Sequence, residues 1–573
     1  MGNSPRETGH NRIDHEIGAI KKDWRNRIRV VLVYPNQYQV GIANLGFQTV
    51  YHLLNSLENV LCERAFLPEP GRGPDRPPSS LESQRTLGEF DLIAFAVSFE
   101  QDYLNILRIL QQSHLPLQAE DRVEAHPLIL AGGVACQLNP EPLAPFMDLF
   151  LIGEAEVLLA PFMEIFHRYP GKQECLRQAA LNVPGAYVPE FYQPQYTPDG
   201  TLAAFTPRPG IPATVKRVYQ ADLSQCPTVS TIVTPHSPFA SPYLVEVGRG
   251  CPHGCRFCSA GYIYRPPRFR PLALLEGCLE RGRSQAKRIG LVGAAVSDLP
   301  GIEQLCQAAE AGGIKLAFSS LRADALTPQL ASALAASGVK TATLAPDGGS
   351  ERLRKVINKG ITAQDILTAT RLLVAHGIPN LKLYFMVGLP TETQTDIDAL
   401  VDLTLQVKEE FLQASQPQGR MGTITVSISC FVPKPFTPFQ WSAMAGFAEL
   451  KARLKQIKRK LAPVANLKVH SDNPRKAWVQ GLLARGDRRV AQILSLALAC
   501  DGNWSQALKA APLNPTLYNS RERPTEELLP WDFIDHGVTK RFLWEEYTRG
   551  MQNRQTPACP PAGCTRCGAC PAP

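Results

Sequence analysis

Three cysteines in one short stretch of the sequence could bind a metal centre. Cys251, Cys255 and Cys258 follow the spacing C-x3-C-x2-C, among glycines and a proline that allow tight bends. Thiolates are soft ligands suited to iron–sulfur clusters and to zinc. Three thiolates on a four-iron cluster leave one iron open to a substrate or cofactor. Zinc completed by His253 is the alternative, but this histidine lies inside the first cysteine loop, where closing a tetrahedron would strain the chain.

Two arginines flank these thiols. We expect Arg249 and Arg256 to help hold the three cysteines as thiolates, because nearby cations lower the pKa of a thiol. Eight of the 15 cysteines are scattered along the chain, and we interpret these as small buried apolar residues.

A second group of cysteines lies near the end of the sequence. Its four thiols are spaced C-x4-C-x2-C-x2-C, at Cys559, Cys564, Cys567 and Cys570. This spacing is near that of ferredoxin-type ligands, and the small residues between the cysteines leave room for a cluster. Four cysteines also satisfy tetrahedral zinc, and redox-active or metal-free thiols are the third interpretation. With four ligands supplied, we expect a structural or electron-relaying site.

The first cysteine group follows one of six β-like runs, which helical segments separate. The separations leave room for one crossover helix each, which predicts parallel strands arranged as a barrel or partial barrel. The runs are Tyr243–Val247, Ile289–Val292, Ile314–Ser319, Thr341–Leu344, Leu381–Val387 and Thr423–Phe431.

Short apolar runs also alternate with helical stretches in the N-terminal third. They are Ile28–Tyr34, Phe90–Val97, Leu128–Ala131 and Asp148–Ile152. This alternation predicts a Rossmann-like, doubly wound parallel sheet. Glycines that follow the strands, such as Gly132 and Gly133, fit the edge where such sheets bind ligands, and equally fit plain turns.

These patterns predict an α/β protein with four parts. They are an N-terminal Rossmann-like domain at 1–183, a proline-rich connection at 184–241, a barrel at 242–471 and a mostly helical C-terminal region with the cysteine-rich tail at 472–573. Hydrophobic residues make up 44% of the 573 residues and charged residues 20%, which excludes global disorder. Neither a membrane-spanning apolar run nor a signal peptide is present in the sequence, so we expect a cytoplasmic protein.

The first cysteine motif resembles the signature of the radical S-adenosylmethionine (SAM) superfamily, C-x3-C-x-aromatic-C after the first strand of a partial (β/α)6 TIM barrel, with Phe257 as the aromatic residue. The resemblance implies a [4Fe-4S] cluster on Cys251, Cys255 and Cys258, whose fourth iron is chelated by the amino and carboxylate groups of SAM. It also implies reductive cleavage of SAM to a 5′-deoxyadenosyl radical, which abstracts a substrate hydrogen. An electron donor of the flavodoxin or ferredoxin type is implied as a partner.

Further motifs resemble a subgroup that joins a cobalamin-binding-like N-terminal domain to the radical SAM barrel and carries a C-terminal Cys-rich tail. They imply cofactor contacts at successive strand ends, from Ser320, Arg322, Asp347 and Gly388. The hydroxyl and guanidinium groups would reach ribose or carboxylate, and Asp347 would bind ribose hydroxyls. Gly388 would let the backbone approach the nucleotide closely.

Two positions depart from the patterns of this family. Related enzymes carry Gly-Gly-Glu after the second barrel strand to bind the methionine amine, whereas this chain has Gly293-Ala-Ala-Val-Ser-Asp298. Asp298 is the remaining candidate for that contact. Asp347 stands where the family pattern has Glu, so its reach is one methylene shorter.

The N-terminal resemblance implies a cobalamin site. Ser98, Gly132 and Gly133 occupy the positions where the related domain places its Ser and Gly-Gly motifs beside the corrin. The D-x-H-x-x-G motif that supplies an axial histidine is absent, because Asp14–Gly18 has the wrong spacing. Cobalamin would then be held without a histidine on cobalt, which is compatible with methyl transfer. The alternative is a domain that keeps the fold without the cofactor, or that shapes a substrate pocket.

The leading interpretation is a radical SAM enzyme, with cobalamin-linked methyl transfer if cobalamin binds. One alternative is a cobalamin-free radical enzyme that modifies RNA or protein. The non-enzymatic alternative is an iron–sulfur electron-transfer or assembly protein, although electron carriers normally use four protein ligands. A net charge of +8 and lysines at 451, 455 and 458 permit RNA or another anionic substrate without identifying one.

Overall fold

The computed structural model describes residues 13–68, 77–236, 243–318, 321–419, 421–560 and 564–570. A six-stranded sheet forms the N-terminal part, and every strand except β6 is parallel to its neighbours. In sheet order the strands are β2 (Val60–Phe66), β1 (Ile28–Tyr34), β3 (Leu92–Ala96), β4 (Leu128–Gly132), β5 (Leu149–Leu151) and β6 (Ala186–Tyr187).

Helices cover both faces of this sheet. The run Val30–Tyr34 of β1 is almost completely buried, which is typical of a parallel strand packed on both faces. Helix α3 (Leu45–Ser56) packs against α6 (Ala155–Arg168), while α4 (Tyr103–Gln112) packs against a helix of the C-terminal region. The predicted Rossmann-like sheet is therefore confirmed.

Seven further parallel strands form two hydrogen-bonded groups, which share one hydrophobic core. The first group is β10 (Tyr243–Glu246), β13 (Arg288–Val292) and β14 (Lys315–Phe318), and the second is β15 (Thr341–Asp347), β16 (Asn380–Val387), β17 (Ile424–Cys430) and β18 (Leu467–Ser471). Among the described residues, β14 and β15 share no ladder, so the barrel is open there. All six predicted strands are present. The edge strand β18 was not predicted, because the run is short and only its first residue, Leu467, is buried.

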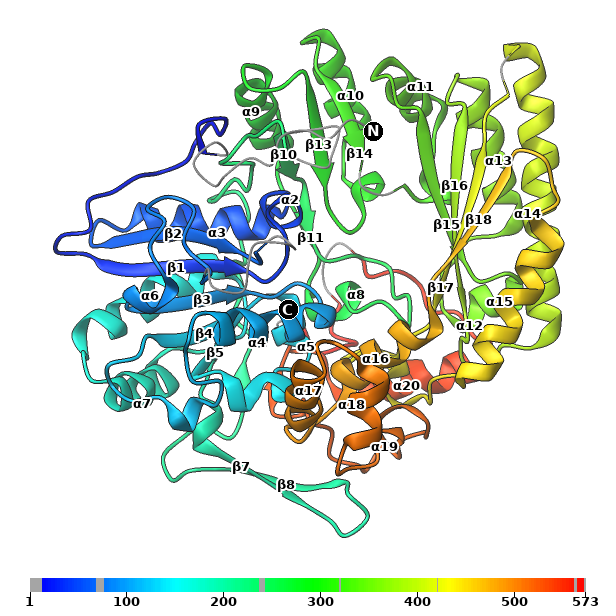
Figure 1. The fold of residues 1–573 in the computed structure, drawn as a ribbon. Coiled ribbons are helices and arrows are strands. Elements are labelled where there is room, and N and C mark those ends of the chain that lie inside the picture. The colour runs from blue at the N-terminus through cyan, green and yellow to red at the C-terminus, as the bar shows by residue number, and fades with distance from the viewer. Residues whose placement is uncertain are drawn as a thin grey trace.

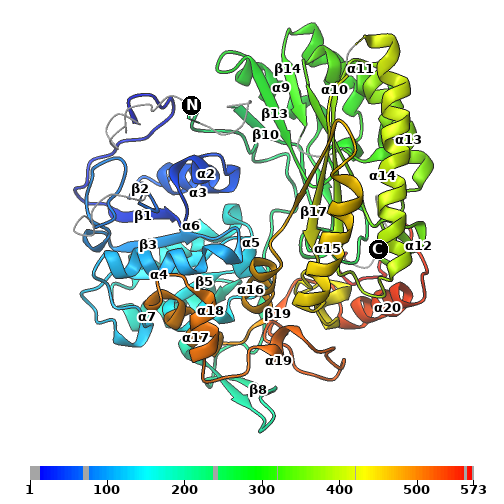
Figure 2. The ribbon, with the colours of Figure 1, turned by 45° about the vertical axis from the view of Figure 1, so that its right-hand side comes forward.

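Helices alternate with these strands as the crossover connections require. They are α9 (Leu272–Arg283), α10 (Ile302–Ala311), α11 (Pro328–Ala336), α13 (Ala363–Ala375), α14 (Gln394–Ser415) and α15 (Phe447–Leu461). In Figures 1 and 2 the N-terminal sheet and the barrel strands stand side by side, and the C-terminal helices lie beneath both.

The C-terminal region joins the two halves. Its helices are α16 (Pro474–Arg485), α17 (Val490–Ala499), α18 (Trp504–Ala510), α19 (Thr516–Asn519) and α20 (Lys540–Met551). Buried residues such as Trp531 and Leu482 belong to the same hydrophobic core as the N-terminal sheet. The strand β19 (Ile534–Asp535) pairs with β9 (Val215–Lys216) of the connection. No helix in the described part of the chain is long and apolar enough to cross a membrane.

The turn between β4 and α5 (Val134–Leu138) generates a prediction about stability. Gly133 has φ +107°, and a Cβ there would lie 2.4 Å from the carbonyl oxygen of Val97. At Gly132 a Cβ would meet only the carbonyl oxygen of Leu151, at 3.5 Å. We expect Gly133→Ala to lower the free energy of unfolding by about 1–3 kcal/mol, and Gly132→Ala by less than about 1 kcal/mol. Urea denaturation midpoints compare the two, and equal midpoints would contradict this account.

Candidate functional site

The first cysteine group lies on a loop that a short hairpin closes. Strand β11 (Gly248–Arg249) enters the loop, and β12 (Arg268–Phe269) leaves it antiparallel to β11. Gly250 has φ +81°, and a Cβ there would lie 2.7 Å from the carbonyl oxygen of Tyr264, so the turn requires glycine. We refer to residues 250–267 as the cysteine loop. All three of its thiols occupy buried or half-buried positions.

Burial and nearby charges act on these thiols in opposite directions. Burial raises the pKa of Cys251 to about 12 and that of Cys255 to about 11. The Lys359 ammonium group lowers the pKa of Cys255 and Cys258, and backbone N–H groups of residues 260 and 261 also lower that of Cys258. The metal-free thiols are therefore protonated at neutral pH, and metal binding must release their protons.

The structure corrects the prediction that the two flanking arginines hold the thiolates. Arg249 instead pairs with three carboxylates, and Arg256 pairs with Glu546 at 3.1 Å. Both guanidinium groups therefore position the loop. The cations that act on Cys255 are Lys359 and Arg322, which come from distant segments. Sequence reasoning missed Lys359 as a site residue, because its contact with Asp347 depends on the tertiary fold.

Two of the predicted strand-end residues meet beside Cys255. Asp347, the last residue of β15, has φ +61° and accepts a hydrogen bond from Lys359 Nζ at 2.6 Å. Arg322 pairs with Asp324 at 2.7 Å and donates to the backbone carbonyl of Lys359 at 3.2 Å. Asp347, Arg322 and Lys359 all influence the pKa of Cys255. Ser320, predicted at the same strand end as Arg322, lies outside the described residues.

An unsatisfied carboxylate oxygen lies next to the cysteine loop. His253 Nε2 and Asp298 Oδ1 share a hydrogen bond of 2.8 Å. Asp298 Oδ2 is buried and has no hydrogen-bond partner among the described residues. The charge of Asp298 acts on Cys251, which places this carboxylate beside the thiols. The histidine considered as a zinc ligand thus contacts Asp298, and its pairing with this carboxylate had no signal in the sequence.

Two other predicted residues are explained by packing. A Cβ at Gly388, which has φ +84°, would lie 2.7 Å from Leu450 Cδ2 of α15, so this position requires glycine without any ligand. The Gly388 N–H donates to Glu392 Oε2 at 2.8 Å. Phe257 is half-buried and packs against the core shared by the N-terminal and C-terminal parts. A cofactor contact of either residue stays a prediction.

A cavity of about 500 Å³ separates the N-terminal sheet from the cysteine loop. Ser98, Gly132 and Gly133 line it on one side, and the loop residues Ala260 and Tyr264 line it on the other. The Ser98 hydroxyl accepts a hydrogen bond from Asn44 Nδ2 at 3.1 Å. None of the described residues that line the cavity is a histidine. The three residues predicted for cobalamin therefore share one cavity with the cysteine loop.

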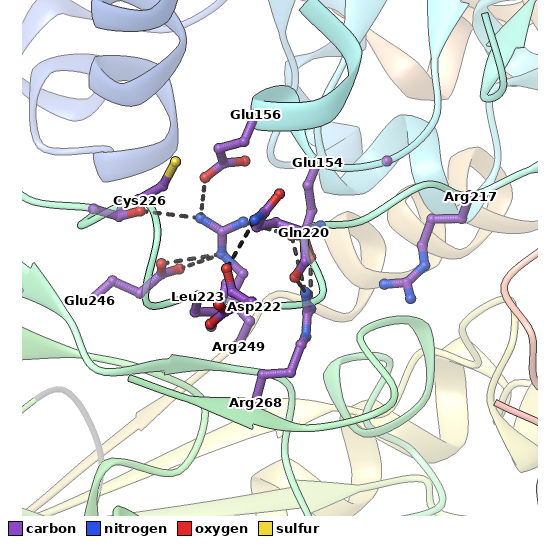
Figure 3. Close-up of polar contacts among 12 residues, drawn as sticks. Glu154, Glu156, Arg217, Gln220, Asp222, Leu223, Cys226, Glu246, Arg249 and Arg268 are labelled. Atoms are coloured by element: carbon purple, nitrogen blue, oxygen red, sulfur yellow. Dashed lines mark hydrogen bonds and ion pairs between the residues drawn. The ribbon is translucent and has the colours of Figure 1, made fainter. Parts of the chain in front are cut away.

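Figure 3 shows a network of buried charges, of which Glu154, Glu156, Glu246 and Arg249 line this cavity. Arg249 Nη1 contacts Glu154 at 2.7 Å, and the same guanidinium group contacts Glu156 and Glu246. Glu154 also pairs with Arg268 at 2.7 Å. Glu154 and Glu156 come from the start of α6, whereas the arginines belong to the hairpin that closes the cysteine loop. The network therefore ties the N-terminal sheet to this loop.

The donor set of the cysteine loop fits an iron–sulfur cluster. It offers three thiols on one turn, with the cations Lys359 and Arg322 nearby to balance thiolate charge. In the described part of the chain, no three His, Cys, Asp or Glu side chains are close enough together to bind one metal ion. Binding a cluster must therefore bring the thiols closer.

The four cysteines near the C-terminus lie behind this loop. The backbone N–H of Cys559 donates to the carbonyl of Pro252, which follows Cys251, at 2.7 Å. Cys559, Cys564 and Cys567 line one small cavity together with Gly254 of the loop. The sequence separates the two groups by about 300 residues, so their proximity could not have been predicted from the sequence.

Comparison with known families and proteins agrees with this arrangement. The family model described as "Radical SAM proteins, N-terminal" matches residues 46–189, and the model of the "Radical SAM superfamily" matches residues 245–404. The chain is 29% identical over 470 residues to the uncharacterized protein MJ0966 of Methanocaldococcus jannaschii, which covers 81% of this chain and 90% of that protein.

Solved structures show more distant similarity. The cobalamin-dependent SAM radical enzyme OxsB, with aqua-cobalamin and SAM bound, is 14% identical, with 92% of this chain and 79% of that chain covered and a TM-score of 0.46. OxsB with aqua-cobalamin alone is 17% identical, with a TM-score of 0.44, and the match covers 66% of this chain and about half (52%) of that one. Coproporphyrinogen III oxidase (HemN) from Escherichia coli is 12% identical, covers 38% and 52% of the two chains and has a TM-score of 0.29.

The two family matches extend over the parts of the structure that build the site. The N-terminal match spans most of the first sheet, and the superfamily match runs from β10 through the cysteine loop into α14. The expected resemblance is thus confirmed: the chain belongs to the radical SAM superfamily of enzymes, and this membership implies a [4Fe-4S] cluster and SAM as its cofactors.

Proposed function

We propose that this radical SAM enzyme binds SAM between the cysteine loop and the ends of β13, β14 and β15, and binds cobalamin in the neighbouring cavity for methyl transfer. The observation that carries the proposal is the single cavity of about 500 Å³ that Gly132 and Gly133 share with the cysteine loop. A [4Fe-4S] cluster, when bound and reduced, supplies the electron that cleaves SAM to a 5′-deoxyadenosyl radical.

Asp298 is our candidate for the amino group of SAM. Its Oδ2 is buried without a partner, and an unsatisfied buried carboxylate oxygen costs free energy that an ammonium donor would recover. His253 holds the other oxygen at 2.8 Å, which fixes the direction of the carboxylate. Asp298 therefore takes the role that glutamate has in the Gly-Gly-Glu motif of related enzymes.

Arg322 and Asp347 are our candidates for the remaining polar groups of SAM. Asp324 orients the Arg322 guanidinium group, whose unused donors suit the methionine carboxylate. Asp347 keeps one oxygen on Lys359, and its other oxygen suits a ribose hydroxyl. Lys359 would balance part of the negative charge that thiolates bring to the loop.

The cavity has the volume and the lining of a cofactor pocket. Its volume lies within the range of cofactor pockets, and its lining combines apolar side chains with backbone at glycines. A Cβ at Gly132 would meet no protein atom closer than 3.5 Å, so packing alone does not require this glycine. Because no histidine lines the cavity in the described chain, cobalt would carry no histidine ligand, which is compatible with methyl transfer.

An anionic substrate would meet a basic, exposed face of α15. This helix exposes three lysines, Lys451, Lys455 and Lys458. Their positive charge suits RNA or another anionic substrate, and such a substrate stays a prediction. A corrinoid-free radical reaction is the alternative outcome of the cobalamin experiment below.

We expect anaerobically reconstituted enzyme to form 5′-deoxyadenosine from SAM and a strong reductant, and Cys258→Ala to form none. We expect Asp298→Asn to keep its iron while its Kd for SAM rises about 10- to 100-fold, because hydrogen bonds to charged groups contribute about 1.5–3 kcal/mol. Isothermal titration of the loaded enzyme measures this constant.

Asp199→Asn is the matched control for Asp298→Asn, since Asp199 is exposed on the turn between β7 (Tyr192–Tyr196) and β8 (Leu202–Pro207). An unchanged Kd in Asp298→Asn would remove this residue from the SAM site. Wild-type enzyme that holds a full cluster and forms no 5′-deoxyadenosine would refute the proposed activity.

The cobalamin site is tested by filling the cavity. We expect wild-type protein to retain stoichiometric cobalt after incubation with hydroxocobalamin and gel filtration. Gly132→Leu should lose the cobalt and keep its iron, because the added side chain enters the cavity. The control is Gly277→Leu on α9, where a Cβ meets no atom within 4 Å. Cobalt retention by Gly132→Leu, or no retention by the wild type, would refute cobalamin binding in this cavity.

A further inference from the structure

The C-terminal tail, described at residues 554–560 and 564–570, is anchored to the back of the cysteine loop. The N–H of Cys559 donates to the carbonyl of Pro252 at 2.7 Å. Asn358 bridges the two segments, because its Nδ2 donates to the Gly254 carbonyl at 3.1 Å and its Oδ1 accepts from the Thr556 N–H at 2.8 Å. Both loop contacts lie between Cys251 and Cys255. The tail thus contacts the backbone of the loop that carries Cys251, Cys255 and Cys258.

A buried ion pair strengthens this attachment. Arg256, which is fully buried, contacts Glu546 of α20 at 3.1 Å and donates to the Arg554 carbonyl at 2.8 Å. Glu546 in turn accepts from the Thr556 hydroxyl at 2.8 Å. Arg256 lies between Cys255 and Cys258 and bonds to both α20 and the tail. The loop, α20 and the tail are therefore joined by one polar network.

The four tail thiols lie near one another on the outer side of this network. Cys567 is buried, whereas Cys559, Cys564 and Cys570 are half-buried, and Cys559, Cys564 and Cys567 line one small cavity. The Cys567 carbonyl accepts a hydrogen bond from the Thr539 N–H at 2.9 Å, which fixes the tail at the start of α20. Thr565 and Arg566 between these cysteines are exposed. The group therefore faces the cysteine loop on one side and solvent on the other.

The donor set favours an iron–sulfur cluster over zinc. The segment Cys564–Cys570 has the spacing C-x2-C-x2-C, as in the ligand run of bacterial ferredoxins. Structural zinc sites typically take paired ligands from two separate segments. Arg265 lies beside Cys567 and Cys559 and offers positive charge to bound thiolates. Among the described residues, no three His, Cys, Asp or Glu side chains are arranged as metal ligands. Cluster binding would therefore bring the four thiols into ligand positions.

We propose that Cys559, Cys564, Cys567 and Cys570 hold a second iron–sulfur cluster, which passes one electron from an external carrier to the cluster of the cysteine loop. The relay rests on the proposed function, whereas the metal site itself does not. A reduced low-potential flavoprotein or ferredoxin loses one electron, and the loop cluster gains it. No bond forms or breaks, and no proton moves, in this step.

Iron content tests the site directly. We expect reconstituted wild-type protein to hold about eight iron atoms and eight sulfides per chain, corresponding to two [4Fe-4S] clusters. The triple variant Cys251→Ala, Cys255→Ala, Cys258→Ala and the double variant Cys564→Ser, Cys567→Ser should each hold about four iron atoms. The triple variant should still give the electron paramagnetic resonance signal of a reduced cluster, from the tail alone.

Cys500→Ser is the matched control, because this half-buried cysteine at the end of α17 belongs to neither group, and it should keep the full iron content. A triple variant that binds zinc and no iron would overturn the cluster assignment, as would a double variant with the full wild-type iron content. If the double variant fails to fold, the triple variant still decides, since its tail is intact.

The relay is tested on the double variant loaded with its loop cluster. We expect dithionite to reduce this cluster, while reduced flavodoxin loses the ability to do so, as followed by freeze-quenched paramagnetic resonance. Equal reduction of wild type and double variant by flavodoxin would overturn the relay. Wild type with two clusters and no 5′-deoxyadenosine would instead refute the proposed function and leave the second cluster in place.

Discussion

The Arg249 guanidinium group is the interaction on which the rest of the site depends. It lies two residues before Cys251 and contacts Glu154 and Glu156 of the N-terminal part and Glu246 of the barrel. All four side chains are largely buried, so removing one partner would strand charge and cost about 3–5 kcal/mol. The Arg249 side chain fixes the backbone just before Cys251. It also ties the N-terminal sheet to the cysteine loop, and the cavity lies between this sheet and the loop.

The cysteine loop is consequently held from two sides. The Arg249 network and the cavity lie in front of it, and the tail with the Arg256–Glu546 pair lies behind it. Such a loop presents its thiols from a rigid frame, as a site must when it confines a reactive radical. The cavity and the cysteines of the C-terminal tail thus lie on different sides of the cysteine loop.

Local patterns made much of this predictable. The alternation of strands with helices depends on neighbours in sequence, and the structure confirms it. The spacing of Cys251, Cys255 and Cys258 is equally local, and their assignment as cluster ligands stays a prediction. Charge pairing depends on the tertiary fold, so it could not be predicted. Arg249 was expected beside the thiols and instead binds Glu154 and Glu156, both more than 90 residues away in the sequence. Two other contacts also depend on the tertiary fold and have no signal in the sequence pattern. They are the contact of Lys359 with Asp347 and that of Cys559 with Pro252.

The central claim is that the cluster on the cysteine loop keeps one iron open for SAM. Its most direct test is the paramagnetic resonance spectrum of the reduced Cys564→Ser, Cys567→Ser variant, recorded with and without SAM labelled with ¹⁷O at the methionine carboxylate. The account predicts a shifted spectrum and a hyperfine coupling from the label, because the carboxylate coordinates iron directly. An identical spectrum with no coupling, from protein that holds the loop cluster, would contradict it.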